Sequence, residues 1–501
     1  MEKNNPAETH DLFCYDLPSA PLAHIGKILV SGASGYIGGR LVPELLHRGY
    51  TVRAIVRGDP FAYSTTWESA EIVKADALRK EDLQAALSGI DSAYYLIHSL
   101  HLGPKEFEKA DIQAACNFRD AAQEQGVKRI IYLGGLGDLR SGLSSHLRSR
   151  LEVAEELKKG KVPVTTLRAA VIIGSGSASY EILQHLVRKL PFMLIPDWAK
   201  NKCQPIGIRD VIKYLVGVLE VPQTQGKSFD IGGKDVLTYE EMLKIFARIL
   251  HKKTIFVDFP FFPLKAYAYC ASLLTPVPHS ISRCLMEGLK NEVICYDDSI
   301  TRFLPFEPLF YKEQIIRALS REEQDTVSTR WSDAHHPYYE FTLKLFEIKK
   351  GYTYKTAYSL CTEKAAAGLF KSLCRVGGRR GWFYYNWLWR LRGTIDRILL
   401  GVGTVRGRKS YSHLKVNDCI DFFRVEDIVE DTRLLLRAEM KIPGKAWLEF
   451  AIAETAGKRK LSVIAYYNTE SLWGKLYWYA CFPFHHFIFK RLLTEIEKRA
   501  H

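Results

Sequence analysis

The feature that most constrains this chain is an apolar run that leads directly into a glycine-rich turn. Residues 27–31 read KILVS, and residues 32–39 read GASGYIGG. Gly32 allows a sharp turn, Gly35 allows a close approach of backbone to phosphate, and Gly38 allows tight packing of the following helix on the strand. The pattern predicts a strand, a turn and a helix whose N-terminus faces an anion. We therefore expect a dinucleotide site with contacts from Gly32, Ser34, Gly35, Tyr36, Ile37 and Gly38.

The end of the next expected strand bears on the choice of cofactor. Residues 51–56 read TVRAIV and form an expected strand that ends at Arg57, close to the position where an acidic residue would bind a ribose hydroxyl. A guanidinium suits a 2′-phosphate, so the sequence favours NADP. Asp59 is near enough in sequence to keep NAD possible.

Strands and helices alternate through the first 320 residues. Strands are expected at 71–76, 91–98 and 127–133, with helices at 80–87 and 105–125 between them. This alternation is typical of right-handed βαβ units and predicts an α/β fold with a doubly wound parallel Rossmann sheet. Further cofactor contacts are expected where strands end, from Asp76, Ala77, Leu96, Ile97 and His98.

Residues 26 to about 320 resemble the atypical or extended short-chain dehydrogenases/reductases, an NAD(P)-binding, epimerase-like group. The resemblance rests on the glycine motif, on TLRA at 166–169, on QPIGIRDV at 204–211 and on FDIGG at 229–233. It implies a Rossmann domain over residues 25–320, preceded by an N-terminal tail at 1–24. It also implies oxidoreductase activity, with Arg168 near the cofactor.

The catalytic pattern of that group is replaced here. Short-chain dehydrogenases use a Tyr and a Lys four residues later on one helix face, and His146 and Arg150 take these positions. In one interpretation, His146 is a substitute acid/base with an ordinary pKa near ~6.5, and Arg150 binds ribose or phosphate. In the other, the domain binds nucleotide without catalysis, and both residues belong to a polar helix face.

An aromatic segment at 256–278 contains FPFFP and is interrupted by prolines. It is too short to span a membrane. In the group that the chain resembles, this position belongs to the variable substrate side. The segment is consistent with a greasy substrate, with an interface, or with ordinary core packing.

The chain changes character after a polar linker expected at 321–337. A strand at 340–348, a helix at 363–373, antiparallel strands starting at 418, 433, 445 and 460, and a helix at 472–499 predict an α+β domain at 338–501. This order suggests the START-like helix-grip fold, in which a helix roofs a hydrophobic cavity. The half also resembles the uncharacterised C-terminal domain fused to bacterial short-chain dehydrogenases, through GWF at 381–383, AEMKIPG at 438–444 and LYWY at 476–479.

Charge is concentrated in this second half. The formal net charge is +14, and 29 Lys and Arg stand against 17 Asp and Glu from Trp331 onward. Basic residues and tryptophans alternate between 375 and 409, but no recognised nucleic-acid module accompanies them, so we do not expect nucleic acid as a partner. Peripheral contact of this segment with an anionic membrane is favoured over contact with nucleic acid. An interpretation without any partner, in which the arginines are solvated around an aromatic core, explains the pattern as well as membrane contact does.

The ten cysteines form no CxxC pair and no cluster with metal-ligand spacing, so we expect reduced thiols and no metal. No secretory signal is visible, which favours a cytoplasmic protein.

Two functions remain open on the sequence. The first is an NADP-dependent oxidoreductase of the atypical short-chain type that acts on an apolar small molecule. The second is a non-catalytic NADP sensor or assembly factor whose C-terminal domain binds a lipid or a protein.

Overall fold

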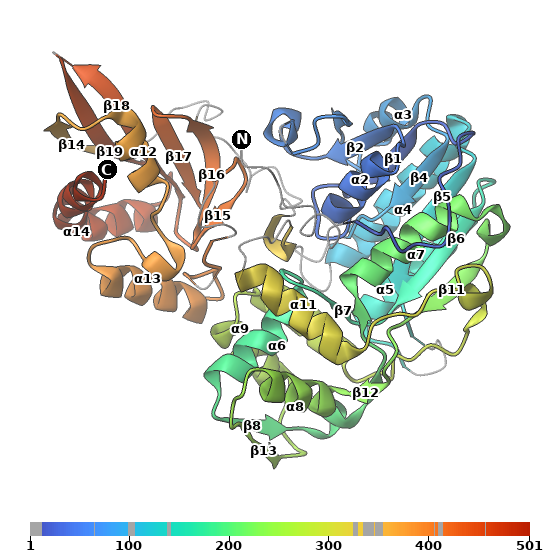
Figure 1. Cartoon of the computed structure of the whole chain (residues 1–501). Coiled ribbons are helices and arrows are strands. Elements are labelled where there is room, and N and C mark those ends of the chain that lie inside the picture. The colour runs from blue at the N-terminus through green and yellow to red at the C-terminus, as the bar shows by residue number, and fades with distance from the viewer. Residues whose placement is uncertain are drawn as a thin grey trace. The chain divides into compact units, whose positions relative to one another are not determined.

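The computed structural model describes residues 13–64, 66–98, 106–137, 142–323, 329–333, 345, 354–404, 406–408, 414–455 and 457–500. It divides into two compact units (Figure 1). The first comprises Met1–Leu274 and His279–Pro337, and the second comprises Thr275–Pro278 and Tyr338–His501. Residues 1–12 of the expected tail, parts of the expected linker and nearly all of the strand expected at 340–348 lie outside the described residues.

A seven-stranded, wholly parallel sheet forms the centre of the first unit, as the sequence predicts. On one side of β1 the sheet continues through β2 to β3, and on the other side it continues through β4, β5 and β6 to β11. The strand order therefore reverses between β1 and β4. Ligands of open α/β sheets bind at the carboxyl ends of the strands at such a point. In sheet order, the strands are β11 (Ser228–Ile231), β6 (Val164–Ala169), β5 (Arg129–Gly135), β4 (Ser92–Tyr95), β1 (Ile28–Ser31), β2 (Val52–Val56) and β3 (Glu71–Lys74).

Helices cover both faces of this sheet because successive side chains of a strand point to opposite faces. Val30 of β1 shares a buried core with Leu41 and Leu215. Leu29, its neighbour in the strand, shares a second core with Phe118 and Leu157 on the other face. The helices are α2 (Gly38–His47) and α7 (Ile208–Glu220) on the first face, and α3 (Lys80–Leu87), α4 (Glu106–Glu124) and α5 (Ser145–Lys158) on the second.

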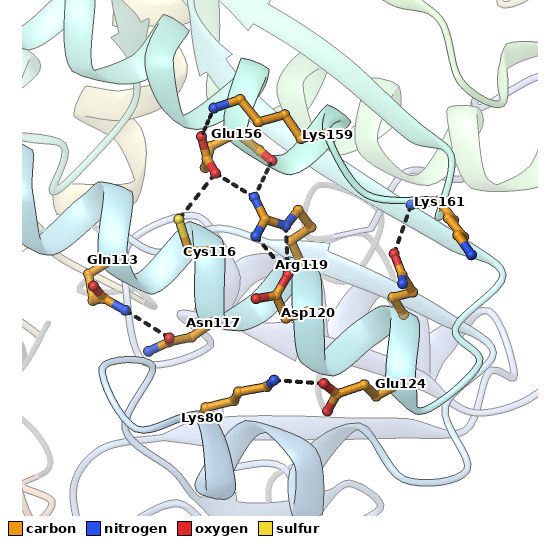
Figure 2. A network of polar contacts seen from close by, with 11 residues as sticks. Lys80, Gln113, Cys116, Asn117, Arg119, Asp120, Glu124, Glu156, Lys159 and Lys161 are labelled. Carbon is orange, nitrogen blue, oxygen red and sulfur yellow. Dashed lines mark hydrogen bonds and ion pairs between the residues drawn. The ribbon is translucent and has the colours of Figure 1, made fainter.

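A network of polar contacts joins α4 to α5 (Figure 2). Arg119 of α4 donates to the carboxylate of Glu156 of α5 and also pairs with Asp120 at 2.7 Å. The amide of Asn117 in α4 donates to the backbone carbonyl of Ala77 at 3.0 Å. The network therefore fixes α4 against both α5 and the segment that follows β3.

Replacement of Arg119 by Ala is expected to lower the free energy of unfolding by about 1–2 kcal/mol. The reason is that the side chains of Arg119 and Glu156 are only 19% and 15% exposed, so water screens their ion pair weakly; Glu156 keeps its pairing with Lys159, which limits the loss. Arg79→Ala is the matched control, because Arg79 is 69% exposed and lies 3.6 Å from Asp82. Urea titrations of both variants measure the difference, and equal losses would contradict this account.

The rest of the first unit includes a parallel pair formed by β8 (Phe192–Ile195) and β13 (Ile255–Asp258). Its other strands are β7 (Ile172–Ile173), β9 (Lys202–Cys203), β10 (Ile206–Gly207) and β12 (Leu237–Thr238). Its α-helices are α6 (Ala178–Lys189), α8 (Tyr239–Ile249), α9 (Leu264–Leu274), α10 (His279–Gly288) and α11 (Tyr311–Glu323). Among the described residues of both units, the short 3-10 helices are η1 (Pro60–Tyr63), η3 (Asp197–Lys200), η4 (Pro222–Thr224), η5 (Ser299–Arg302), η6 (Trp331–Asp333) and, in the second unit, η9 (Gly378–Arg380).

The second unit is an antiparallel six-stranded sheet with helices packed against it. In sheet order, the strands are β14 (Tyr354–Thr362), β19 (Lys458–Asn468), β18 (Lys445–Thr455), β17 (Arg433–Ala438), β16 (Phe423–Val429) and β15 (Cys419–Ile420). The helices are α12 (Ala366–Leu373), α13 (Asn386–Ile398) and α14 (Leu472–Lys498). Leu492 and Ile496 of α14 share one core with Phe450 and Val463 of the sheet, so α14 covers one of its faces. The predicted meander and closing helix are confirmed.

Two elements of this unit were not predicted. Strand β14 pairs along its whole length with β19. Along most of this strand the side chains alternate only between half-buried and exposed. Helix α13 escaped prediction because its buried positions are Gly393, Asp396 and Arg397 rather than apolar residues. Among the described helices of the chain, none is long and apolar enough to cross a lipid bilayer.

Candidate nucleotide-binding and proton-transfer site

The glycine-rich turn brings backbone so close to backbone that side chains are excluded. Gly32 has a φ of +67°, and a Cβ there would lie 2.7 Å from the carbonyl oxygen of Leu96. A Cβ on Gly38 would lie 2.4 Å from the carbonyl oxygen of Gly32. The turn thus holds the start of α2 close against the end of β1.

The N-terminus of α2 is left open toward this turn. No side chain caps it, and its first turn contains no acidic residue. The first N–H groups of a helix lack intrahelical partners and carry partial positive charge. This end of α2 is therefore suited to a phosphate group.

A cleft of about 400 Å³ begins at the turn and extends past the carboxyl ends of β1, β2, β3 and β4. Arg57 and Asp76 lie together at the β2 and β3 end, where burial lowers the pKa of Arg57 and the Asp76 carboxylate opposes that shift. Asp59 is not part of the lining, and its carboxylate instead accepts from the backbone N–H of Phe61. The predicted site residues that line the cleft are Gly32, Ser34, Gly35, Tyr36, Ile37, Gly38, Arg57, Asp76, Ala77, Leu96, Ile97, His98 and His146.

Two predicted site residues lie elsewhere. Arg150 sits behind the cleft wall, where its guanidinium donates to the carbonyls of Ile97 and Leu133. Arg168 pairs with Asp230 at 2.7 Å across the edge of the sheet. Both guanidinium groups therefore bond to protein oxygens, and neither residue belongs to the lining of the cleft. Arg150 thus links the segment after β4 to β5 behind the cleft.

Three polar side chains form a hydrogen-bonded series at the cleft, which we call the Asp–His–His triad: Asp111, His98 and His146. The carboxylate of Asp111 lies 2.7 Å from Nδ1 of His98. Nε2 of His98 lies 3.2 Å from Nδ1 of His146. The triad draws on three elements, since Asp111 belongs to α4, His146 to α5, and His98 follows β4. The network around Arg119 therefore holds together the two helices on which the triad depends.

Burial controls the protonation of both imidazoles. It lowers the pKa of His146 well below 6.5, and the neighbouring His98 and Arg150 lower it further. Burial also lowers the pKa of His98, against the opposing effect of Asp111. Both rings are consequently neutral at neutral pH. With the Asp111 carboxylate as acceptor, His98 donates through Nδ1 and accepts the Nδ1 proton of His146, so Nε2 of His146 is left as a base.

The stability of the protein should therefore fall as the pH drops below about 6.5. In the unfolded chain an imidazole takes up a proton near pH 6.5, whereas in the folded state it takes one up only at the lowered pKa. His185 and His485, with pKa values lowered to about 4 by burial, act with the same sign. Calorimetry between pH 7.5 and 5.5 is expected to show a falling melting temperature. The slope should become shallower in the variant with both His98→Asn and His146→Phe, and an unchanged slope would contradict the burial of the pair.

Asp111 and most of the apolar end of the cleft were not predicted from the sequence. Asp111 is 1% exposed on the apolar stripe of α4, between Phe107 and Ala114, and an acid on such a stripe was a usable signal. The apolar end comes from Ile281, Leu285, Leu289 and Trp331, which no motif indicated. The aromatic segment at 256–278 does not line the cleft; Phe261, for example, is 89% exposed.

The described residues contain no group of three or more His, Cys, Asp and Glu arranged to hold a metal ion. All ten cysteines are free thiols.

Fold and cleft together define a dinucleotide-binding Rossmann protein of the atypical short-chain dehydrogenase type, joined to a second α+β domain. The chain belongs to the NmrA-like family, whose profile matches residues 25–323. Residues 348–492 match a family described as a protein of unknown function, DUF2867.

Individual relatives are distant. The photosystem II assembly factor Ycf39 of Trieres chinensis is 22% identical over 240 residues, which are 48% of this chain and 74% of that protein. The chloroplastic divinyl chlorophyllide a 8-vinyl-reductase of Zea mays is 24% identical over 250 residues, 46% of this chain and 61% of the reductase. The solved triphenylmethane reductase of Citrobacter sp., complexed with NADP(H), is 20% identical, with 58% of this chain and 99% of that chain covered and a TM-score of 0.48.

Proposed function

We propose that the first unit is an NADP(H)-dependent oxidoreductase that acts on an apolar small molecule. The observation that carries the proposal is the position of the Asp–His–His triad, which ends at His146 in the wall of the cleft that begins at the glycine-rich turn. The residues present suit the cofactor. The glycine-rich turn and the uncapped N-terminus of α2 suit the pyrophosphate, and the guanidinium of Arg57 suits a 2′-phosphate. The apolar lining from α10 and Trp331 suits an apolar substrate.

The triad can move one proton to or from the substrate. When it holds an extra proton, His98 is an imidazolium beside Asp111, and His146 keeps a proton on Nε2 that it can donate. After that donation the Nε2 proton of His98 passes to Nδ1 of His146, and the neutral resting state is restored. A bound NADPH would supply the hydride that completes a reduction. In the oxidative direction each transfer is reversed, with Nε2 of His146 as the base.

A substrate panel tests the proposal. Purified protein is incubated with NADPH and conjugated or aromatic carbonyl compounds, and the loss of NADPH absorbance is followed. The proposal expects turnover of at least one apolar member, which disappears in His146→Phe. Saturable NADPH binding without turnover across the panel would contradict catalysis and leave only a binding function.

Replacement of Arg57 by Leu is expected to weaken NADPH binding about 10- to 100-fold while NADH binding changes less than about twofold. A charge-assisted hydrogen bond to phosphate is worth roughly 1.5–3 kcal/mol, and NADH lacks the 2′-phosphate that would receive it. Arg53→Leu is the control, because Arg53 lies on the same strand but bonds to the carbonyls of Ala86 and Ser88. Fluorescence titration with both nucleotides measures the ratio, and equal losses for NADPH and NADH would count against NADP specificity.

A second candidate function is that of an assembly factor that binds NADP without turnover. It is favoured by the exposed apolar residues of α14, since Leu472, Trp473 and Leu476 are 82%, 75% and 60% exposed. Exposed apolar patches of this kind commonly mark protein interfaces. The likeness to an assembly factor agrees with this candidate. A protein partner that co-purifies with the chain and is lost in Leu472→Glu/Leu476→Glu, in a protein without NADPH turnover, would establish it.

A further inference from the structure

The outer side of α14 is apolar although it is exposed to solvent. On its inner side the helix packs on the sheet through Trp478 and Phe489, which are 6% and 4% exposed. On its outer side Trp473, Tyr479 and Phe487 are 75%, 64% and 63% exposed. A helix that is apolar all round belongs in a protein core or in contact with lipid. The outer side of α14 is therefore a candidate contact surface.

Helix α13 carries a stripe of large apolar side chains on its exposed side. They recur at intervals of three or four residues, so they lie on one side of the helix. They are Trp387, Leu391, Ile395 and Ile398, with exposed fractions of 61%, 49%, 45% and 55%. The buried positions of α13 are instead Gly393, Asp396 and Arg397. This pattern is the inverse of that of a helix that packs only on its own protein.

The exposed sides of the two helices adjoin each other. Nε of Arg392 in α13 donates to the hydroxyl of Tyr477 in α14 at 3.4 Å. Leu391 and Ile395 of α13 line one opening together with Phe484 of α14. We call the exposed side of α13 together with that of residues 472–491 in α14 the α13–α14 face.

The exposed charges of the α13–α14 face are all positive. Between Glu470 and Glu495 the sequence contains no acidic residue. The one acidic residue of α13, Asp396, is fully buried. The exposed cations are Arg390, Lys475, Lys490 and Arg491. The face thus combines large apolar and aromatic side chains with a net positive charge.

This combination favours one kind of occupant. In a twofold dimer the face would lie against the same face of a second copy, so cations would meet cations. A protein partner would need an acidic surface of matching shape. An anionic lipid bilayer offers acyl chains to the apolar residues and phosphates to Lys and Arg, and Trp and Tyr are favoured at the boundary between these two layers. Charge and aromatic content therefore favour a membrane surface.

We propose that the second unit docks on anionic lipid bilayers through the α13–α14 face. The outer side chains of both helices enter the boundary between headgroups and acyl chains, and the exposed cations contact lipid phosphates. Both helices stay on the surface of the bilayer, because Trp389 of α13 and Phe489 of α14 hold them to the core of the second unit. The docking surface is separate from the cleft of the first unit and does not depend on catalysis there.

Sedimentation of the full chain with lipid vesicles tests the proposal. The wild type should bind vesicles of phosphatidylcholine with about 30% phosphatidylglycerol about tenfold more tightly than vesicles of phosphatidylcholine alone. Raising the salt concentration to about 0.5 M should remove most of this preference, because salt screens exposed charges. Absence of binding to the anionic vesicles at low salt would overturn the proposal.

The apolar contribution is tested with Trp473→Ser/Phe487→Ser, which should weaken binding to the anionic vesicles about tenfold or more. Phe61→Ser/Phe261→Ser is the control, because these residues of the first unit are 86% and 89% exposed. If circular dichroism shows that the first variant is unfolded, Leu391→Ser/Ile398→Ser removes apolar side chains from α13 instead. Equal binding by a folded face variant and the control would overturn the proposal.

The contribution of charge is tested with Lys475→Glu/Lys490→Glu, which should abolish the preference for anionic vesicles. Lys252→Glu/Lys253→Glu changes the net charge by the same amount at exposed positions of the first unit, and it should keep the preference. Equal losses in both variants would mean that net charge alone attracts the chain, and would overturn the assigned face. A dimer or a protein complex that depends on Trp473 and Phe487, without vesicle binding, would assign the face to a protein and overturn the proposal as well.

Discussion

His146→Phe is expected to lower the turnover of the best substrate about 100- to 1,000-fold and to leave the dissociation constant of NADPH within about threefold. General acid–base catalysis contributes typically 10²–10⁴-fold to rate, and phenylalanine keeps the ring but has no transferable proton. The nucleotide-binding turn is formed by other residues, so binding should persist. Steady-state kinetics and NADPH titration measure the two quantities separately. His24→Phe is the control, because His24 is exposed and does not line the cleft.

The dependence of the reduction rate on pH tests whether the whole triad, and not His146 alone, takes part in proton transfer. Reduction should accelerate as the pH falls from 8 toward 6, because the proton-donating state of the triad is populated only near the lowered pKa values of His98 and His146. Asp111→Asn should reduce turnover about tenfold and move this profile to lower pH, since an amide stabilises the His98 imidazolium less than a carboxylate does. An unaltered profile in Asp111→Asn would remove Asp111 from the mechanism.

Gly38→Ala is expected to weaken NADPH binding more than 100-fold. The added Cβ would lie 2.4 Å from the carbonyl oxygen of Gly32, so α2 must move away from β1 and its N-terminus must leave the phosphate position. Gly49→Ala is the matched control: Gly49 follows the same helix, has a φ of +87°, and has open space where its Cβ would be. Ala at that φ costs about 1 kcal/mol of strain and should not change affinity. Calorimetric titration of both variants provides the comparison, and tight binding by Gly38→Ala would contradict the position assigned to the pyrophosphate.

The sequence was sufficient for the first unit because local chemistry and global fold agree there. The strand at Ile28–Ser31, the glycines after it and the helix from Gly38 each specify one backbone state, and their order specifies a parallel sheet. The fold of the second unit was harder to predict from the sequence. Helix α13 buries Asp396 and Arg397 instead of an apolar stripe, so periodicity gave no signal.

The candidate site shows the same division. The predicted cofactor contacts on the turn and at strand ends follow from chain position, and all of those predicted after β1, β2, β3 and β4 line the cleft. Side-chain direction does not follow from chain position, which is why Arg150 and Arg168 were placed in the cleft although they bond to Leu133 and Asp230. The meeting of Asp111 with His98 depends on how α4 packs, and no spacing in the sequence specifies that.

Calorimetric titration of the wild-type chain with NADPH tests the central claim most directly, because it requires no substrate. We expect one nucleotide per chain, a dissociation constant in the micromolar range or below, and weaker binding of NADH. A melting temperature that rises with NADPH concentration should accompany it, since a ligand at 100 times its dissociation constant stabilises the folded state by about 2.7 kcal/mol. Absence of both heat and stabilisation at millimolar NADPH would show that the cleft is not a nucleotide site.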